Sequence, residues 1–195
     1  MKRTVTGALL VLATAALAGC FSVVSDSDNA TPQTNSPSGG GSPSPSGGGG
    51  SGALSQQEIN SLLAVHNQAR SEVGVAPLQY SSSLAAYAQE WADHLAASGC
   101  RMQHRTDGTY GENLAIFSGG SHSPAAAAKM WFGEKSAYRG GAVTQGNLMS
   151  VGHYTQMVWR DTTQVGCGRA VCPNGSMIYV CNYNPPGNML NSKPY

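Results

Sequence analysis

A run of seventeen residues, Ser36–Gly52, consists only of serine, proline and glycine and includes eight of the 25 glycines in the chain. Such a segment has no apolar side chain to bury, so it cannot offset the entropy that ordering would cost. We therefore expect a flexible tether over residues 20–52. Folding is then confined to residues 53–195, which are numerous enough to form one compact core.

The first nineteen residues have the pattern of an export signal. Lys2 and Arg3 precede an apolar stretch over residues 8–18, which is too short to span a bilayer comfortably. The segment Leu17-Ala18-Gly19-Cys20 resembles the lipobox of bacterial lipoproteins, in which the cysteine becomes the lipid-modified first residue. We therefore predict a signal peptide over 1–19 and a lipid anchor at Cys20. Ordinary cleavage after Ala18 is the alternative. Either reading predicts export, with lipidation placing the protein at the cell surface or outer membrane.

Cysteine and charge content limit the kind of protein further. Four cysteines lie after the tether, at positions 100, 167, 172 and 181. An even number in an exported domain indicates two disulfides, although spacing leaves all three pairings open. The chain has a net charge of +1 and no basic run, so we expect no nucleic-acid partner. We expect a monomer.

Capping signals and apolar periodicity predict helices first and strands last. One helix begins after Ser55, a second near Ser82 with an end at Gly99, and a third at Pro124 with Ser123 as its N-cap. A shorter helix is expected over 153–159, after a mobile loop over 139–151. Strands are expected over 113–117, 164–171 and 176–183, the last two joined around Asn174-Gly175. This order indicates an α+β layered domain.

Four segments occur in an order that is typical of one family. They are His66-Asn67-Gln68-Ala69-Arg70, Gly111-Glu112-Asn113-Leu114-Ala115, Gly152-His153-Tyr154-Thr155-Gln156-Met157-Val158-Trp159 and Cys181-Asn182-Tyr183-Asn184-Pro185-Pro186-Gly187-Asn188. Together they resemble the CAP superfamily of cysteine-rich secretory, antigen 5 and plant pathogenesis-related class-one proteins. The resemblance implies a three-layer αβα sandwich with disulfides Cys100–Cys172 and Cys167–Cys181.

The resemblance also implies a cleft lined by two histidines and two glutamates, which match His104, Glu112, Glu134 and His153. Neutral imidazoles can hold a divalent ion such as zinc, and carboxylates can orient the rings or activate a bound water. The alternative is a hydrogen-bonded cluster that only stabilises the fold. His66 lies on the apolar face of the first helix, so we interpret it as a core residue outside this site.

Three functions remain open. The first is a non-enzymatic domain that binds a lipid-like or sterol-like molecule, or an extracellular protein, and we expect this more than catalysis. The second is a metal-dependent hydrolase such as a peptidase, in which Glu112 or Glu134 is the general base. The third is release of a C-terminal peptide after Asn184, as the resemblance to plant members implies, with a packed tail as the alternative.

Overall fold

The structure is a computed structural model that describes residues 52–195. The predicted signal peptide over 1–19, Cys20 and all of the predicted tether except Gly52 lie outside the described residues. Within the described part, no helix is long and apolar enough to cross a membrane.

The hairpin strands follow all the helices, as the sequence pattern predicts, whereas two further strands lie between helices. Four α-helices and one short 3-10 helix are described: α1 (Gln56–Ser71), α2 (Ser82–Ala97), α3 (Pro124–Gly133), η1 (Glu134–Ser136) and α4 (Gln145–Met157). The predicted caps are present for two of them. Ser55 and Glu58 form a reciprocal capping box at α1, and the Ser123 side chain accepts from the N–H of Ala126 at α3.

Four strands form one sheet in the order β1-β3-β4-β2: β1 (Gln79–Tyr80), β2 (Gly111–Phe117), β3 (Gln164–Val171) and β4 (Met177–Asn184). β4 pairs antiparallel with both of its neighbours, and β1 pairs parallel with β3. The turn between β3 and β4 contains Asn174 and Gly175, and Gly175 has a φ of +79°. The predicted hairpin is therefore present.

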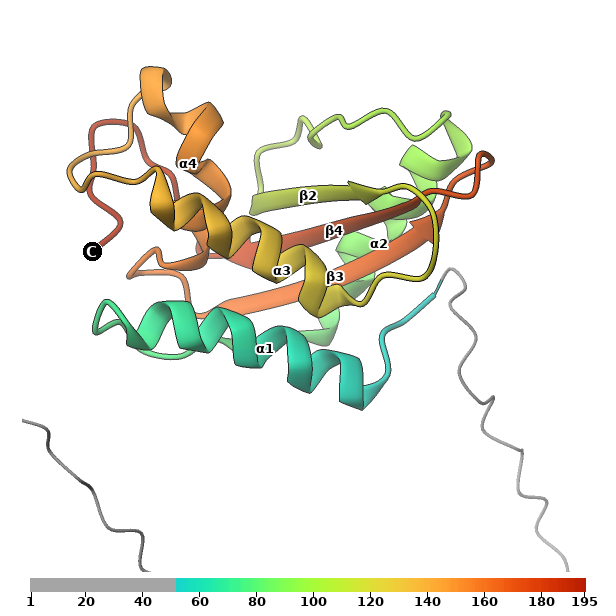
Figure 1. The fold of residues 1–195 in the computed structure, drawn as a ribbon, viewed down its shortest axis with the longest axis horizontal. Helices are drawn as coiled ribbons and strands as arrows, with labels where there is room; N and C mark the ends of the chain where they lie inside the picture. Colours follow the sequence, from blue (N-terminus) through green and yellow to red (C-terminus); the bar gives the residue numbers. More distant parts are fainter. Residues whose placement is uncertain (1–51) are drawn as a thin grey trace, which may run out of the picture. The chain divides into compact units, whose positions relative to one another are not determined.

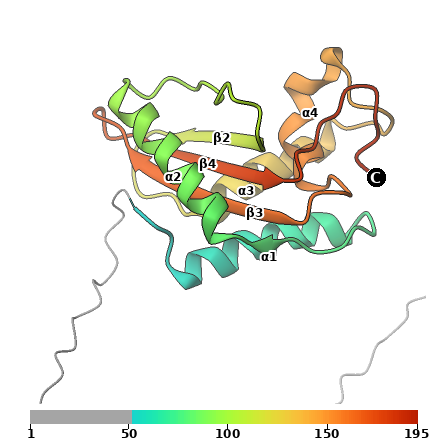
Figure 2. The same cartoon turned by 180° about the vertical axis from the view of Figure 1, so that it is seen from behind.

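The sheet is the middle layer of three. Figure 1 shows α1 and α3 in front of the strands and α2 behind them, and Figure 2 shows α2 from its own side. Successive side chains of β4 point to opposite faces of the sheet, so this strand contacts the helices on both sides. Tyr179 and Tyr183 belong to the core shared with α1 and α3, whereas Ile178 and Val180 belong to the core beneath α2. The predicted αβα sandwich is confirmed.

Two glycines in β3 explain how closely α2 approaches the sheet. A Cβ atom at Gly166 would lie 2.2 Å from the backbone nitrogen of Ala85, and one at Gly168 would lie 2.4 Å from Cα of Gln89. Only glycine leaves room for helix backbone at these distances. The disulfides lie on opposite faces of the same sheet: Cys167–Cys181 in the core with α1 and α3, and Cys100–Cys172 in the core with α2. This is the pairing implied by the family resemblance.

One element differs clearly from its prediction. α4 begins at Gln145 rather than near His153, so half of the expected mobile loop over 139–151 is helical. The helix is capped by Thr144 and Asn147, whose backbone and side-chain groups bond reciprocally. The segment 139–151 has no cysteine and contains three glycines, at 140, 141 and 146, which is why a mobile loop was expected there. The two-residue strand β1 was not predicted, and β2 begins two residues earlier than expected.

Candidate functional site

The four predicted site residues form two separate His–Glu pairs. In the first pair, Nδ1 of His104 donates to Oε1 of Glu112 at 2.8 Å. Glu112 lies on β2, while His104 lies on the connection between α2 and β2. The Glu112 carboxylate also accepts from the N–H of Arg105 at 3.1 Å. The His104 side chain is 62% exposed and the Glu112 side chain only 8%. The buried Glu112 carboxylate therefore orients the exposed His104 imidazole through a hydrogen bond.

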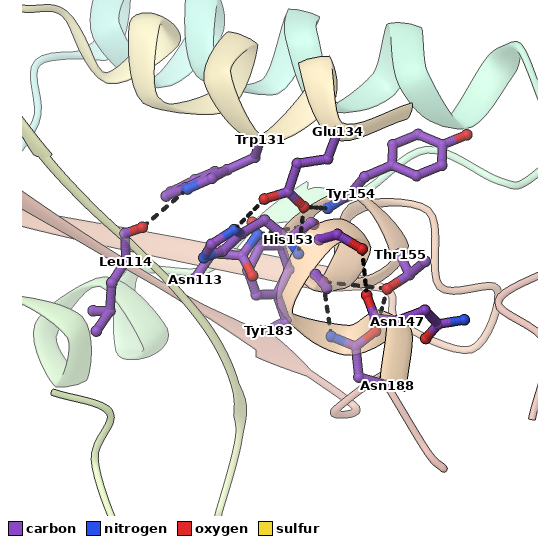
Figure 3. A network of polar contacts seen from close by, with 12 residues as sticks. Asn113, Leu114, Trp131, Glu134, Asn147, His153, Tyr154, Thr155, Tyr183 and Asn188 are labelled. Carbon is purple, nitrogen blue, oxygen red and sulfur yellow. Dashed lines mark hydrogen bonds and ion pairs between the residues drawn. The ribbon is translucent and has the colours of Figure 1, made fainter. Parts of the chain in front are cut away.

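The second pair joins α4 to η1. Nδ1 of His153 donates to Oε1 of Glu134 at 2.6 Å, and Oε2 of Glu134 accepts from the backbone N–H groups of His153 and Tyr154 at 3.0 and 3.1 Å. Figure 3 shows this carboxylate above the backbone of α4. The Glu134 side chain thus binds both the ring and the main chain of the residue that it orients.

The aromatic ring that stacks on the His153 imidazole is also fixed by its own contacts. Trp131 of α3 is fully buried, stacks on the His153 imidazole with centroids 6.0 Å apart, and donates its indole N–H to the carbonyl of Leu114. This indole hydrogen bond is visible in Figure 3. Trp131 therefore provides a fixed apolar surface for the imidazole.

A buried chain of hydrogen bonds connects His153 to the first helix. Nδ1 of His66 contacts the carbonyl of Leu62 at 2.9 Å and must therefore donate, because a carbonyl can only accept. Nε2 of His66 is then the acceptor for the hydroxyl of Tyr183 at 2.8 Å. The amide nitrogen of Asn113 donates to the Tyr183 oxygen and to the carbonyl of His153, both at 3.1 Å. The chain runs from α1 over side chains of β4 and β2, on one face of the sheet, to α4.

Burial keeps this chain uncharged. His66, Tyr183 and Asn113 are each at most 1% exposed. Burial lowers the pKa of His66 to about 4 and raises the pKa of Tyr183 above its ordinary range. The prediction that His66 is a core residue is confirmed. Sequence reasoning missed Asn113 and Tyr183 as supports of His153, although both belong to the quoted family motifs.

Arg70, in the same motif as His66, stabilises the end of α4. Its buried guanidinium donates to the carbonyls of Met157, Trp159 and Thr162 at 3.0, 2.9 and 2.8 Å. The last carbonyls of a helix lack intrahelical partners, and a cation suits the negative end of the helix dipole. The His66–Arg70 segment therefore holds α4 in place and contributes no side chain to the His–Glu pairs.

The two pairs present the same chemistry to solvent. Because each Nδ1 donates to a carboxylate, each Nε2 carries the lone pair that a metal or a ligand donor would use. Among residues 52–195, no three His, Cys, Asp or Glu side chains are grouped so that they could share a metal ion. The donor set therefore fits a divalent ion only in part: each pair offers one imidazole nitrogen, and the remaining ligands would be water or bound ligand.

The C-terminal tail is packed beside α4. Asn191 and Ser192 exchange backbone hydrogen bonds with Val143 at 2.7 and 2.9 Å, and the N–H of Arg160 donates to Pro194. Asn188 donates to the carbonyl of Gly152 and accepts from the Thr155 hydroxyl, a contact visible in Figure 3. Release of a peptide after Asn184 would have to break these contacts, and it stays a prediction.

Two open cavities are lined by residues other than the four site residues. One, of about 450 Å³, is at the end of α2 and is lined by His94, Leu95, Ser98, Gly99, Arg101 and Gln103. The other, of about 530 Å³, is on α3 and η1 and is lined by Lys129, Phe132, Gly133, Lys135, Ser136 and Arg139. Neither is lined by His104, Glu112, Glu134 or His153.

Comparison with known proteins agrees with this geometry. Residues 63–183 match the cysteine-rich secretory protein (CAP) family. Pathogenesis-related protein 1C of Nicotiana tabacum is 45% identical over 141 residues, which are 72% of this chain and 83% of that protein. Pathogenesis-related protein 1 of Arabidopsis thaliana is also 45% identical over 141 residues, covering 72% of this chain and 84% of the relative.

A solved structure has the same fold. The crystal structure of NaASP2 with Zn²⁺ superposes with a TM-score of 0.63 at 27% identity, over 73% of this chain and 87% of that one. The chain belongs to the CAP family. Membership in a family of secretory proteins supports its export, while lipid attachment at Cys20 remains a prediction.

Proposed function

We propose that this protein is an exported, non-enzymatic CAP domain that binds a small lipid-like ligand or an extracellular partner at the His–Glu pairs. In this proposal His104 and His153 supply the metal-binding nitrogens when a divalent ion such as zinc takes part. Lipidation of Cys20 would hold the domain at the cell surface. The proposal includes no group-transfer step.

The hydrogen bonds that Glu134 and Glu112 accept argue against a catalytic role for their carboxylates. Glu134 accepts three hydrogen bonds from His153 and Tyr154, and Glu112 accepts from His104 and Arg105. A carboxylate that already accepts from a ring and from backbone N–H groups has fewer free lone pairs with which to take a proton from a bound water, so it is poorly placed to act as a general base. Its effect is to orient an imidazole and fix its tautomer. Oriented imidazoles whose Nε2 atoms have no hydrogen-bond partner within residues 52–195 suit ligand or metal binding.

One similar solved structure supports the choice of zinc as the metal in this proposal. NaASP2, one of the similar solved structures, is described with Zn²⁺. A bound ion would supply a positive centre for a polar ligand group, and the residues of this chain would hold and orient it. With imidazole nitrogens as the only protein ligands, such a site would be weaker than closed four-ligand zinc sites.

Zinc titration of the exported protein by calorimetry tests the proposal. We expect binding that His153→Ala weakens by roughly tenfold or more, since outer-shell and ligand changes typically cost 10–100-fold in metal affinity. His104→Ala should weaken it too if both rings bind one ion. His94→Ala is the matched control, because His94 stacks on Trp91 and has no carboxylate partner among the described ion pairs.

The second arm concerns ligand and catalysis. Organic extraction of the exported protein should yield a co-purifying lipid or sterol that mass spectrometry identifies, or a pull-down from the surrounding medium should yield a partner. If no lipid, sterol or partner is found and zinc does not bind, the proposal is contradicted. A chelator-sensitive peptidase activity that Glu112→Gln or Glu134→Gln abolishes would establish the hydrolase alternative instead.

A further inference from the structure

The C-terminal tail, residues 185–195, contacts both ends of α4. The N–H of Asn191 donates to the carbonyl of Val143, just before the helix, at 2.7 Å. The N–H of Arg160, just after the helix, donates to the carbonyl of Pro194 at 2.7 Å. Figure 2 shows the tail, in dark red, beside α4. The helix that carries the second His–Glu pair is therefore attached to the tail before its first turn and after its last.

One tail residue also holds the turn of α4 on which His153 lies. The side-chain nitrogen of Asn188 donates to the carbonyl of Gly152 at 2.8 Å, and its side-chain oxygen accepts from the hydroxyl of Thr155 at 2.6 Å. These two partners flank His153 in the sequence. Figure 3 shows Glu134 and Asn188 on opposite sides of this turn. Two contacts from distant parts of the chain thus hold one helical turn between them.

The backbone of the tail is adapted to this close approach. A Cβ atom at Gly187 would lie 2.7 Å from Cγ of Trp159, so a larger residue would push the tail away from the end of α4. Asn188 has a φ of +58°, in the left-handed region that asparagine adopts more readily than most residues. Both residue types therefore suit a tail that brings the Asn188 side chain onto the helix.

The tail is attached less firmly than the strands of the sheet. Its residues 189–193 are exposed, and it contains no strand or helix. Its burial is concentrated at the end, where Pro194 is buried and the ring centroid of Tyr195 lies 6.0 Å from that of Tyr138. Segments with few buried apolar contacts open locally at a lower free energy than core strands. We therefore expect the tail to detach without unfolding of the sheet, which would remove its contacts from α4.

We propose that the tail and the ligand site at His153 are coupled: the docked tail holds His153 in its binding position, and a ligand bound to His153 holds the tail in place. The proposal rests on the function proposed above, in which Nε2 of His153 binds a metal ion or a ligand group. Asn188 acts as a positioning residue, because it contacts the turn that carries His153 and not the imidazole itself. Coupling between two binding events is reciprocal, so each changes the affinity of the other by the same factor, typically about 5–150-fold.

Asn188→Ala tests the effect of the tail on the site, and Asn191→Ala is its matched control. Both asparagines have a positive φ, +58° and +64°, so alanine is strained in a similar way at the two positions. The Asn191 side chain, unlike that of Asn188, makes no hydrogen bond within residues 52–195. Zinc titration of the exported protein by calorimetry should show binding that Asn188→Ala weakens by about fivefold or more and that Asn191→Ala leaves unchanged. Equal affinities of the unmodified protein and Asn188→Ala would overturn the proposal.

NMR of the histidine side chains without zinc separates this proposal from the function on which it rests. The ring nitrogen resonances of His153 should shift in Asn188→Ala. Those of His104 should not, because residues 185–195 make no hydrogen bond to His104 or Glu112 in the described part of the chain. An unmodified protein that binds no zinc contradicts the proposed function and, with it, the ligand half of the coupling. Unchanged His153 resonances in Asn188→Ala overturn positioning by the tail even where zinc binds.

Amide hydrogen exchange measures the effect of the site on the tail. The N–H groups of Asn191 and Arg160 are bonded between the tail and the segments flanking α4, so their exchange reports detachment of the tail. Zinc should slow their exchange by about fivefold or more in the unmodified protein and leave it unchanged in His153→Ala. The N–H of Cys172, bonded to Ser176 in the hairpin, is the reference and should not respond. No slowing in the unmodified protein, or equal slowing in His153→Ala, would overturn the coupling.

Thermal melts distinguish positioning from a merely structural role. Asn188→Ala and Asn191→Ala should melt within a few degrees of each other, because neither side chain lies in the core. A lower melting temperature of Asn188→Ala with unchanged zinc affinity and unchanged His153 resonances would overturn the proposal. If Asn188→Ala unfolds, Thr155→Val replaces it, because valine keeps the shape of threonine and removes one of the two bonds to Asn188. We then expect a smaller loss of zinc affinity in the same direction, and no loss would overturn the coupling.

Discussion

The two His–Glu pairs are chemically alike but supported very differently. Each joins Nδ1 of a histidine to a glutamate, at 2.8 Å for His104 and 2.6 Å for His153. The His153 side chain is 31% exposed, and the His104 side chain is 62% exposed. The difference lies in what surrounds each histidine rather than in the bond within the pair.

His153 is fixed at every polar group except Nε2. Its backbone N–H and its Nδ1 donate to Glu134, and its carbonyl accepts from Asn113. Its ring lies on Trp131. His104, by contrast, lies on a connection between α2 and β2 that has no regular secondary structure. One imidazole is pre-organised by the sheet and α3, and the other depends on a surface segment. Pre-organised groups bind ligands with less ordering cost, so His153 should dominate binding.

The support of His153 should fail at low pH through His66. The pKa of His66 is about 4 in the folded protein and 6.5 in the unfolded chain, because burial disfavours its charged form. The unfolded chain therefore binds the additional proton between these values, so folding stability is complete above pH 6.5. It is lost progressively as the pH falls from 6.5 to about 4, and the total loss is about 3 kcal/mol.

Urea denaturation of the exported protein at several pH values between 4 and 7 measures this loss. His66→Gln is the comparison: it should be less stable at pH 7, because the hydrogen bond from Tyr183 is altered, but its stability should depend less on pH in this interval. Arg70 is the charged group that acts on His66 and is retained in both proteins. An identical pH dependence in the two proteins would show that another group titrates.

Two buried asparagines allow the supports of the two pairs to be removed separately. Asn113 bridges Tyr183 and His153, whereas Asn182 donates to the carbonyl of Gly111 at 3.3 Å and to Glu112 at 3.5 Å. Both are 1% exposed, but the side-chain oxygen of Asn182 has no hydrogen-bond partner. Asn113→Ala removes two buried hydrogen bonds, one to the Tyr183 oxygen and one to the His153 carbonyl, so it should destabilise by about 2 kcal/mol.

Asn182→Ala should cost less, about 1 kcal/mol or below, because it also removes an unsatisfied buried oxygen. Denaturant midpoints measure the two costs, and NMR of the histidine side chains shows which ring responds. We expect the His153 resonances to shift in Asn113→Ala and the His104 resonances to shift in Asn182→Ala. Equal costs would mean that the two pairs are supported equally, and the opposite order would contradict the stronger support of His153.

Much of the fold could be predicted because local signals agree with the tertiary structure. The capping box at Ser55, the Ser123-Pro124 start and the Asn174-Gly175 turn each produced the expected element. α4 was predicted only in its second half, since its glycines hide a helix that tertiary contacts stabilise. These contacts include Glu134 at its middle and Arg70 at its end. Such contacts join residues far apart in sequence and leave no local pattern.

The candidate site, like the fold, could be predicted only in part from the sequence. Motif matching identified the four residues of the pairs, and the structure brings each histidine to a glutamate. Spacing alone could not have paired them, because Glu134 and His153 are joined only when α4 packs on η1. The roles of Asn113 and Tyr183 depend on register: Asn113 lies on β2 directly opposite Cys181 of β4, two residues from Tyr183. Register becomes known only when the strands pair.

The smallest expected effect concerns the support of His104. The guanidinium of Arg105 lies 3.9 Å from the ring centroid of Tyr87 and forms an ion pair with Glu90 on α2. These contacts attach the segment carrying His104 to the helix. Arg105→Ala should cost about 1 kcal/mol or less in global stability, because exposed ion pairs and cation–π contacts are weak. The backbone N–H of Arg105, which donates to Glu112, remains.

Its local effect should be larger than its global one. Amide hydrogen exchange should accelerate over residues 101–110 in Arg105→Ala and stay unchanged around His153 in α4, since only the His104 segment loses its attachment. Arg101→Ala is the matched control, because Arg101 is an exposed cation on the same segment with no ion pair among the described residues. Unchanged exchange in Arg105→Ala would mean that the disulfide at Cys100 and the Glu112 hydrogen bonds suffice to hold the segment. His104 would then be as well fixed as His153, and the contrast between the pairs would reduce to solvent exposure alone.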